Sequence, residues 1–499
     1  MGIRDRMAVG AVWMVGFKLL DRSLGLVSTL ILARVLVPQD FGVVAMAMSF
    51  VALLELATAF GFDVALIQKQ TRERGHWDTA WTFNIILGLS VAVAMVAGAA
   101  YVADFYRQAE LEHVIRALAI GSVVQGFENI GVVAFRTEMR FDREFRFLIS
   151  KKLVAFAVTI PAALILDSYW ALVIGQVTGR ATGAAMSYWL HPYRPRLTLA
   201  AAGDLLHLSK WLLASNVSDY IRERSPDWII GRIAGARALG VYNIGAELAA
   251  LPSTELLAPV NRVVLPAYAR LTADRSGLAR EYLSVLGVVV LLGIPAVVGI
   301  AAVAPLLVMV VLGPRWMDMV PVLTILSFAG VLRIVSGNAF PAYLALRRAD
   351  IAMKLNFMYG STAVLMMLIL VPRHGIVGAA AATLIANLIG APVSIGIAIS
   401  LVGARPIEVL QPIWRPFAAA TGMYLGVAAI TNTRGIAGSG LANFMSLAIA
   451  IAAGIAIYAF LLLMLWTMTG RREGTEAQLL RKAGTIVSRI LHAREIPLK

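Results

Sequence analysis

Cysteine is absent from the 499-residue chain, and charged residues make up only 15% of it. The first absence excludes disulfide bonds and thiol chemistry. The six histidines are scattered, without the spacing of metal ligands. Neither a glycine-rich phosphate loop nor a nucleophile motif occurs in the sequence. The sequence therefore predicts no metal site, no catalytic residue, no site of ATP hydrolysis and no cofactor.

Hydrophobic residues are abundant: they form 59% of the chain, and the mean hydropathy is +0.78. Apolar runs of about 18 or more residues, enough to cross a bilayer, recur from end to end. This pattern predicts an all-α polytopic membrane protein. The first apolar run contains charges and lacks a small-residue cleavage site, so we expect a retained helix rather than a signal peptide.

The apolar pattern predicts about 14 membrane spans. Their approximate limits are 9–33, 42–66, 79–103, 112–134, 148–166, 169–190, 205–231, 240–266, 282–304, 319–343, 351–371, 376–402, 413–431 and 441–467. With a cytoplasmic N-terminus, 28 of the 44 Lys and Arg residues fall in cytoplasmic segments, 7 in the opposite loops and 9 within spans. Cytoplasmic loops carry the excess of positive charge, so both termini are predicted to be cytoplasmic. The net charge of +15 is therefore interpreted as a topology signal, and no nucleic acid is expected.

A shift of 198 residues aligns the start of the chain with its middle, without a gap. It pairs Trp13 with Trp211, Asp21 with Asp219, Arg34 with Arg232, Gly42 with Gly240 and Val43 with Val241. Six spans separate the two copies, an even number, so both copies cross the membrane in the same direction. Parallel repeats of this kind predict two six-helix lobes around a central cavity, followed by two C-terminal helices.

The repeat predicts how the chain is divided. The expected parts are an N-lobe at 1–190, a cytoplasmic linker at 191–204, a C-lobe at 205–402, two further helices at 403–470 and a basic tail at 471–499. The apolar residues of the tail fall on one helical face. This spacing predicts an amphipathic helix that lies on the inner leaflet or docks on a partner.

Charged residues occur inside two equivalent spans. A charge within the bilayer costs at least about 2.5 to 3.5 kcal/mol on insertion scales, yet the first span contains Lys18, Asp21 and Arg22. Its repeat counterpart reads SDYIRERSPDWII. Two interpretations stay open. The charges form ion pairs between helices, with Arg180 and Lys210 extending to the cytoplasmic edge, or they line a water-filled cavity for a charged substrate.

Arginine and lysine suit phosphate and carboxylate groups, so an anionic substrate is favoured. The candidate substrate residues are Lys18, Arg22, Arg222, Arg224, Arg262 and Arg333. Carboxylates are candidates for taking up a coupling ion, H⁺ or Na⁺. They are Asp21, Glu55, Asp219, Glu223, Glu247 and Glu255. Pro226 follows the second charge cluster, and we expect it to break its helix and free backbone carbonyls there.

Three stretches resemble a known family. They are LARVLVPQDFGVVAMAMSFVALLELATAFGFDVALIQ, FRTEMRFDREFRF and SPDWIIGRIAGARALGVYNIGAELAALPSTELLAPVNRVVLPAYARL. The chain resembles the polysaccharide-transporter branch of the multidrug/oligosaccharidyl-lipid/polysaccharide superfamily over roughly residues 8–470. Within that branch it is most similar to Wzx-type flippases and colanic-acid-type exporters.

The resemblance implies a transporter of the bacterial inner membrane that moves undecaprenyl-diphosphate-linked oligosaccharide repeat units. It further implies alternating access through a cationic cavity, driven by an ion gradient. Membrane lipid, a polysaccharide polymerase and the export machinery would be its partners, for exopolysaccharide, capsule or O-antigen assembly. The family has no strict motif that fixes a ligand-binding residue, so only the cavity-lining role is carried over to the charged spans.

Four alternatives stay open at this stage. A peptidoglycan lipid-precursor flippase and a cation-coupled multidrug exporter belong to the same superfamily. The arginines argue against the exporter, because organic cations usually require acidic cavities. A membrane glycan polymerase or ligase would need a large outer loop with catalytic residues, whereas the expected outer loops are short. A non-transporting scaffold for glycan assembly is the structural alternative.

Overall fold

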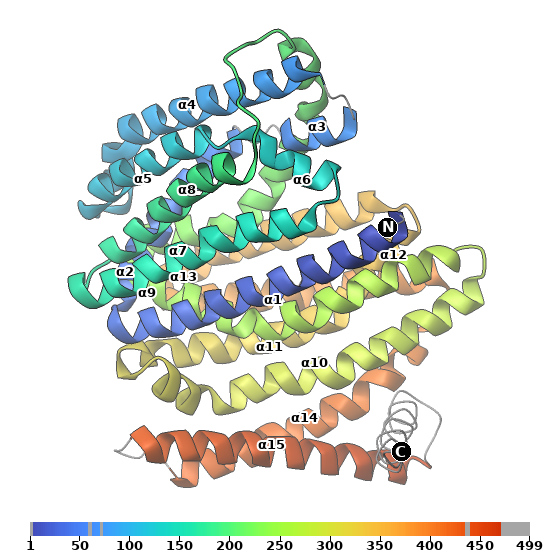
Figure 1. The fold of residues 1–499 in the computed structure, drawn as a ribbon. Coiled ribbons are helices and arrows are strands. Elements are labelled where there is room, and N and C mark those ends of the chain that lie inside the picture. Colours follow the sequence, from blue (N-terminus) through green and yellow to red (C-terminus); the bar gives the residue numbers. More distant parts are fainter. Residues whose placement is uncertain (1–2, 58–61, 70–72, 435–439, 471–499) are drawn as a thin grey trace, which may run out of the picture. The chain divides into compact units, whose positions relative to one another are not determined.

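The computed structural model describes residues 3–57, 62–69, 73–434 and 440–470, and these residues are helical almost throughout (Figure 1). The chain divides into two units between Val241 and Tyr242. The predicted tail helix at 471–499 lies outside the described residues.

The first unit is built from the helices before this division. They are α1 (Ile3–Val35), α2 (Pro38–Ala57), α3 (Phe62–Lys69), α4 (Arg74–Tyr106), α5 (Glu110–Gly126), η1 (Ile130–Val133), α6 (Ala134–Thr137), α7 (Phe141–Leu166), α8 (Trp170–Leu190) and the first part of α9 (Ala202–Arg270). Helix α4 packs on α5, α7 on α8, and α1 on α7. The chain bends by 67° between α5 and the short η1–α6 segment, so the predicted span 112–134 is a broken one.

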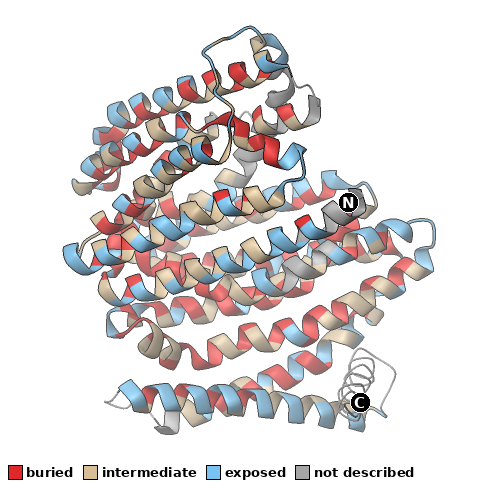
Figure 2. Ribbon diagram, viewed as in Figure 1, coloured by how far each residue is buried: buried red, intermediate tan, exposed pale blue. Residues whose placement is uncertain are grey.

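The second unit contains the rest of α9 and the helices that follow. They are α10 (Arg275–Val311), η2 (Pro314–Met319), α11 (Val320–Gly337), α12 (Ala339–Ala345), α13 (Ala349–Val402), α14 (Pro406–Arg434) and α15 (Gly440–Met468). Burial differs sharply among them (Figure 2): 61% of the apolar window of α10 is buried, against 17% for α15. Helix α10 thus forms the core of this unit, whereas most of α15 is exposed within it.

Two glycines break the longest helices. Within α9 the backbone departs from helical geometry at Gly235, with φ of 85° and ψ of 178°, and within α13 at Gly375, with φ of 55°. These conformations are readily adopted only by glycine. The prediction that Pro226 breaks the helix is wrong, because α9 runs through it. Helices that span membranes tolerate proline where neighbouring groups satisfy the freed carbonyl.

When each half of α9 and α13 is counted separately, most of the 14 predicted spans correspond to single helices. The exceptions are 42–66, which falls on α2 and α3, and 112–134 and 319–343, which each fall on more than one helix. By length and composition alone, seven described helices could cross a membrane, or eight if the bent α5 and η1–α6 pair is one span. This number is smaller than the 14 predicted spans partly because helices with several charged residues do not count as apolar. One of them is α1, which contains Lys18, Asp21 and Arg22.

The first turn of α2 and the part of α9 just after Gly235 meet in a seam that follows the 198-residue repeat. A Cβ atom added at Gly42 would overlap the carbonyl oxygen of Ala236, and one added at Gly240 would overlap that of Pro38. Gly42 and Gly240 are equivalent under the repeat, and Pro38 and Ala236 are also 198 residues apart. The Gly42–Ala236 contact and the Gly240–Pro38 contact are therefore equivalent under the repeat. A two-fold relation between the two copies requires such a pair of contacts.

We expect alanine at Gly42 or Gly240 to destabilise the protein by about 1 to 3 kcal/mol, because a rigid backbone carbonyl occupies the site of the new methyl group. Gly16→Ala is the matched control, since nothing lies within 4 Å of its added Cβ. Thermal unfolding of the detergent-solubilised protein measures the difference. Equal melting temperatures for Gly42→Ala and Gly16→Ala would contradict the seam.

Candidate functional site

The charged turn of α1 is divided between a free cation and an ion pair. Lys18 is exposed and makes no hydrogen bond or ion pair within the described part of the chain. Asp21 Oδ1 lies 3.0 Å from Nζ of Lys152 on α7. The contact is purely electrostatic, because this oxygen accepts no hydrogen bond from described residues. Arg22 is partly buried beside them. The nearby stem of α1 packs on α7 through Trp13, whose ring lies 5.0 Å from that of Phe145.

A second ion pair joins α2 to α8. Glu55 Oε1 lies 2.7 Å from a guanidinium nitrogen of Arg180, which also donates to Ser122 Oγ on α5 at 3.0 Å. The Arg180 side chain is only 15% exposed. For Arg180 these contacts favour an ion pair between helices, and its extension to the cytoplasmic edge stays a prediction. Gly121 makes room for its stem, because a Cβ there would lie 3.0 Å from Arg180 Cδ.

Two further ion-paired groups lie where the chain bends after α5. Lys151 Nζ on α7 donates to Glu128 Oε2 at 3.1 Å. Arg136 on α6 donates to Glu144 at 2.6 Å and lies 3.5 Å from Asp63 on α3. Lys151 and Lys152 are adjacent, so on a helix they point in directions about 100° apart, and they serve different carboxylates.

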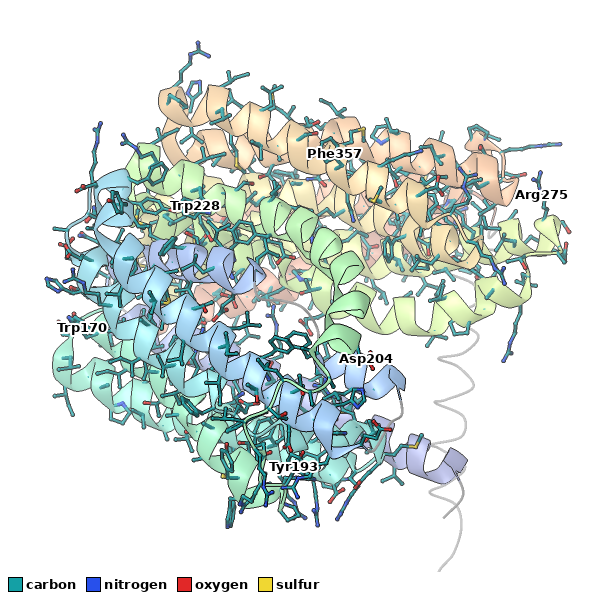
Figure 3. The ribbon with its side chains drawn as sticks, turned by 90° about the horizontal axis from the view of Figure 1, so that it is seen from above. Trp170, Tyr193, Asp204, Trp228, Arg275 and Phe357 are labelled. Atoms are coloured by element: carbon teal, nitrogen blue, oxygen red, sulfur yellow. The ribbon has the colours of Figure 1, made fainter. Side chains whose placement is uncertain are left out.

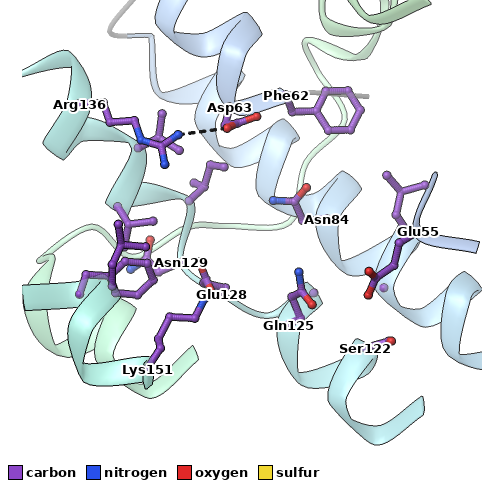
Figure 4. A pocket seen from close by; sticks show the side chains of 18 of the residues that line it. Glu55, Phe62, Asp63, Asn84, Ser122, Gln125, Glu128, Asn129, Arg136 and Lys151 are labelled. Atoms are coloured by element: carbon purple, nitrogen blue, oxygen red, sulfur yellow. Dashed lines mark hydrogen bonds and ion pairs between the residues drawn. The ribbon is translucent and has the colours of Figure 1, made fainter. Parts of the chain in front are cut away.

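Glu55 and the two ion-paired groups after α5 line a cavity of about 510 Å³, here called the N-unit pocket (Figure 4). Its polar lining consists of Glu55, Asp63, Asn84, Ser122, Gln125, Glu128, Asn129, Arg136, Glu144 and Lys151. Helices α2 to α7 all contribute to it. In Figure 4, Asn84 and Gln125 lie between the Glu128–Lys151 pair and Glu55.

Small residues give the N-unit pocket its space. Helices α4 and α5 cross at Gly88 and Gly126, where a Cβ on Gly88 would come within 2.9 Å of the Gly126 Cα. On α8, a Cβ at Gly183 would lie 2.7 Å from Lys151 Cε and 2.9 Å from Glu128 Oε2. The Glu128–Lys151 pair therefore rests on a glycine, and a larger residue at that position would displace it.

The charge cluster of α9 also forms ion pairs. Arg222 lies 3.0 Å from Glu223, with both side chains largely exposed. Arg224 lies 3.3 Å from Asp227, whose side chain is 5% exposed. The same helix is bound to α2 by a polar link, because the Tyr220 hydroxyl donates to the backbone carbonyl of Ser49 at 2.9 Å.

The other sequence-predicted residues are scattered. The side chains of Asp219 and Arg262 lie outside the described residues. Glu247 is partly buried in the second part of α9, and Glu255 is exposed and accepts from Thr254 Oγ1 at 3.3 Å. Arg333 lies on α11, and its Nε is buried without a hydrogen-bond partner among the described residues. The structure leaves their predicted roles as predictions.

The linker 191–204 is held along the first turns of α4 by hydrogen bonds (Figure 3). Asp78 Oδ1 accepts from the Tyr193 hydroxyl at 2.8 Å and from the Arg196 amide at 2.9 Å. Thr82 accepts from the Thr198 amide at 3.0 Å, and His76 Nε2 lies 3.3 Å from Asp204. The linker is therefore a fixed part of the first unit.

The Tyr193 hydroxyl is a strong candidate for the main anchor of the linker. Burial, together with the hydrogen bond to Asp78, raises the pKa of this phenol well above its ordinary value, so it remains a donor. We expect Tyr193→Phe to destabilise the protein by about 1.5 kcal/mol, as for a hydrogen bond to a charged group. Tyr101→Phe, at a side chain 78% exposed, is the control in thermal unfolding. If both changes lower the melting temperature equally, the Tyr193 hydroxyl does not anchor the linker.

The sequence of this chain is similar to a family of polysaccharide biosynthesis proteins. The model of the polysaccharide biosynthesis protein family matches residues 31–321. Lipopolysaccharide biosynthesis protein WzxC of Escherichia coli (strain K12) is 26% identical over 426 residues, 84% of this chain and 86% of WzxC. Succinoglycan biosynthesis transport protein ExoT of Rhizobium meliloti (strain 1021) is 24% identical over 326 residues, 64% of this chain and 66% of ExoT.

Solved structures share the fold. The lipid II flippase MurJ, in an inward closed conformation, gives a TM-score of 0.72 at 12% identity, over 92% of this chain and 99% of MurJ. An inward-facing multidrug resistance transporter of the MATE family gives a TM-score of 0.60 at 16% identity, over 76% of this chain and 94% of that transporter. The predicted fold class, an all-α two-lobe membrane transporter, is confirmed. Because the family model covers more than half of its length, the chain belongs to the polysaccharide biosynthesis protein family.

Proposed function

We propose that the protein is a flippase that moves undecaprenyl-diphosphate-linked oligosaccharide repeat units across the bacterial inner membrane, with both termini in the cytoplasm. Its family and its relatives WzxC and ExoT, both named for polysaccharide biosynthesis, support this substrate class. The fold supports the transport step, because MurJ is a flippase of a lipid. Alternating access carries the head group while the lipid tail stays in the bilayer.

The observation that carries the proposal is the exposed ammonium of Lys18. It lies 15 residues into α1, about 22 Å along the helix at 1.5 Å per residue, and it has no partner among the described residues. A free charge at such a depth cannot face hydrocarbon cheaply, so a water-filled passage is the environment that suits it. An anionic diphosphate is the complementary cargo.

The coupling ion is part of the same proposal. Asp21 and Glu55 remain candidates for binding H⁺ or Na⁺, although each now has a cationic neighbour, Lys152 and Arg180. Binding of an anionic head group beside α1 would draw Lys152 away from Asp21 and leave that carboxylate open to the coupling ion, which would tie ion uptake to cargo binding.

Transport in reconstituted vesicles tests the proposal. The probe is the lipid-linked repeat unit isolated from the source cells, with a fluorophore attached to the sugar. We expect label added to one leaflet to become accessible to a membrane-impermeant quencher on the other side, faster than in protein-free vesicles. An imposed proton or sodium gradient should change this rate. No translocation by folded protein would rule out the flippase, and transport of tetraphenylphosphonium instead would indicate a drug exporter.

A further inference from the structure

The N-unit pocket offers polar groups that the protein itself does not use. Asn84 and Gln125 make no side-chain hydrogen bond within the described residues. Glu128 engages one carboxylate oxygen with Lys151, which leaves the other oxygen as an acceptor. Lys151 uses one of the three N–H donors of its ammonium on this carboxylate. Two amides, one carboxylate oxygen and one ammonium therefore remain to bind a ligand.

The charge balance of the pocket argues against an anion. Four carboxylates belong to it, from Glu55, Asp63, Glu128 and Glu144. The cations that meet them number three, Arg136, Lys151 and Arg180. One negative charge is in excess, and every cation is already held at 3.5 Å or less by a carboxylate. A diphosphate would have to displace a carboxylate and would meet repulsion from the rest.

A metal ion is disfavoured on different grounds. In the described part of the chain, no three or more histidine, aspartate or glutamate side chains are placed to hold one. The N-unit pocket is instead wide, at about 510 Å³, within the range of sites for small organic molecules. Its apolar lining, which includes Leu87, Val91 and Leu148, is too interrupted by polar groups to suit a lipid tail.

A sugar ring has the matching chemistry. Each hydroxyl group donates and accepts at once, so it can bridge an amide such as Gln125 and a carboxylate such as Glu128. A neutral sugar also leaves the existing ion pairs intact, and a buried ion pair that loses one partner is strongly destabilising. The Glu128–Lys151 ion pair is already formed and packs closely against Gly183, so these two groups are positioned before a ligand arrives.

We infer that the N-unit pocket is a subsite for a neutral, hydroxyl-rich sugar residue of the transported head group, distinct from the group that holds the diphosphate. This inference rests on the proposed function. Asn84 and Gln125 provide paired donors and acceptors, and Glu128 and Lys151 provide a fixed acceptor and donor (Figure 4). Sugar selectivity of the transporter would then lie in α4, the C-terminal end of α5 with the turn that follows it, and α7, and not in the cationic turn of α1.

Binding to the full-length protein in lipid nanodiscs tests the inference. The probes are the lipid-linked repeat unit from the source cells and bare undecaprenyl diphosphate. We expect Asn84→Ala and Gln125→Ala to weaken binding of the repeat unit by about ten- to a hundredfold and to leave binding of the bare lipid unchanged. Neither change removes a member of an ion pair, so the fold is retained. Asn356→Ala, an exposed amide on α13, is the matched control.

The outcomes separate the two claims. Equal weakening of both lipids would overturn the subsite, because the pocket would then act on the diphosphate or on the fold. Unchanged binding of the repeat unit in the Asn84→Ala, Gln125→Ala double variant would also overturn it, while leaving the flippase intact. A wild-type protein that binds neither lipid would overturn the proposed function itself. If tetraphenylphosphonium binds, the Asn84→Ala and Gln125→Ala variants weaken its binding, and the repeat unit does not compete with it, the N-unit pocket is a site for a cation instead.

Discussion

Arg180→Ala is expected to reduce the free energy of unfolding by about 3 kcal/mol and to lower the amount of protein in the membrane severalfold. The change removes the guanidinium 2.7 Å from Glu55 and the donor to Ser122. Breaking a buried ion pair costs about 3 to 5 kcal/mol. The lower end applies here, because the Glu55 side chain keeps 37% exposure. Membrane-fraction immunoblots and thermal unfolding measure both effects.

Two controls make this result specific. In the Glu55→Gln, Arg180→Gln double variant no unpaired charge remains, so we expect most of the lost stability to return. Arg116→Ala breaks the Arg116–Glu112 pair on the surface of α5, and such exposed pairs contribute about 0.3 to 0.5 kcal/mol. If Arg180→Ala melts like Arg116→Ala, the pair between α2 and α8 does not stabilise the first unit.

The sequence predicted the helices well, because apolar runs and basic loops are local signals. Most of the expected spans reappear as single helices, and the repeat pairs Gly42 with Gly240, which the structure places in one seam. The helix break was misplaced. Pro226 is the stronger local signal, but Gly235 adopts the backbone conformation that other residues avoid. A glycine break depends on tertiary packing, which a single sequence does not reveal.

The site was only partly predictable for a similar reason. The sequence identified Glu55 and Asp21 as charges that need an explanation, yet it could not identify their partners. Lys152 and Arg180 come from helices more than 120 residues away in the chain. Asn84 and Gln125 gave no signal at all, because an isolated amide in an apolar helix usually packs without a ligand. Only the arrangement of α2 to α7 makes them lining residues of one cavity.

Lys18→Ala is expected to slow translocation of the lipid-linked repeat unit by about ten- to a hundredfold while leaving the protein folded. A hydrogen bond to a charged group contributes about 1.5 to 3 kcal/mol, and each 1.4 kcal/mol is tenfold. The fold should persist, because Lys18 is exposed and has no partner among the described residues. The vesicle assay measures the rate, and thermal unfolding measures the stability.

The pattern of variants decides between the two interpretations of the charged spans. Lys18→Arg should retain most of the transport, since a positive charge remains to meet the diphosphate. Lys354→Ala, at a side chain 75% exposed, should change neither rate nor stability. If Lys18→Ala transports normally, the exposed ammonium contributes no cargo contact. If it instead lowers the melting temperature as Arg180→Ala does, α1 carries structural charge, and the cationic passage must be sought in Arg22, Arg222 and Arg224.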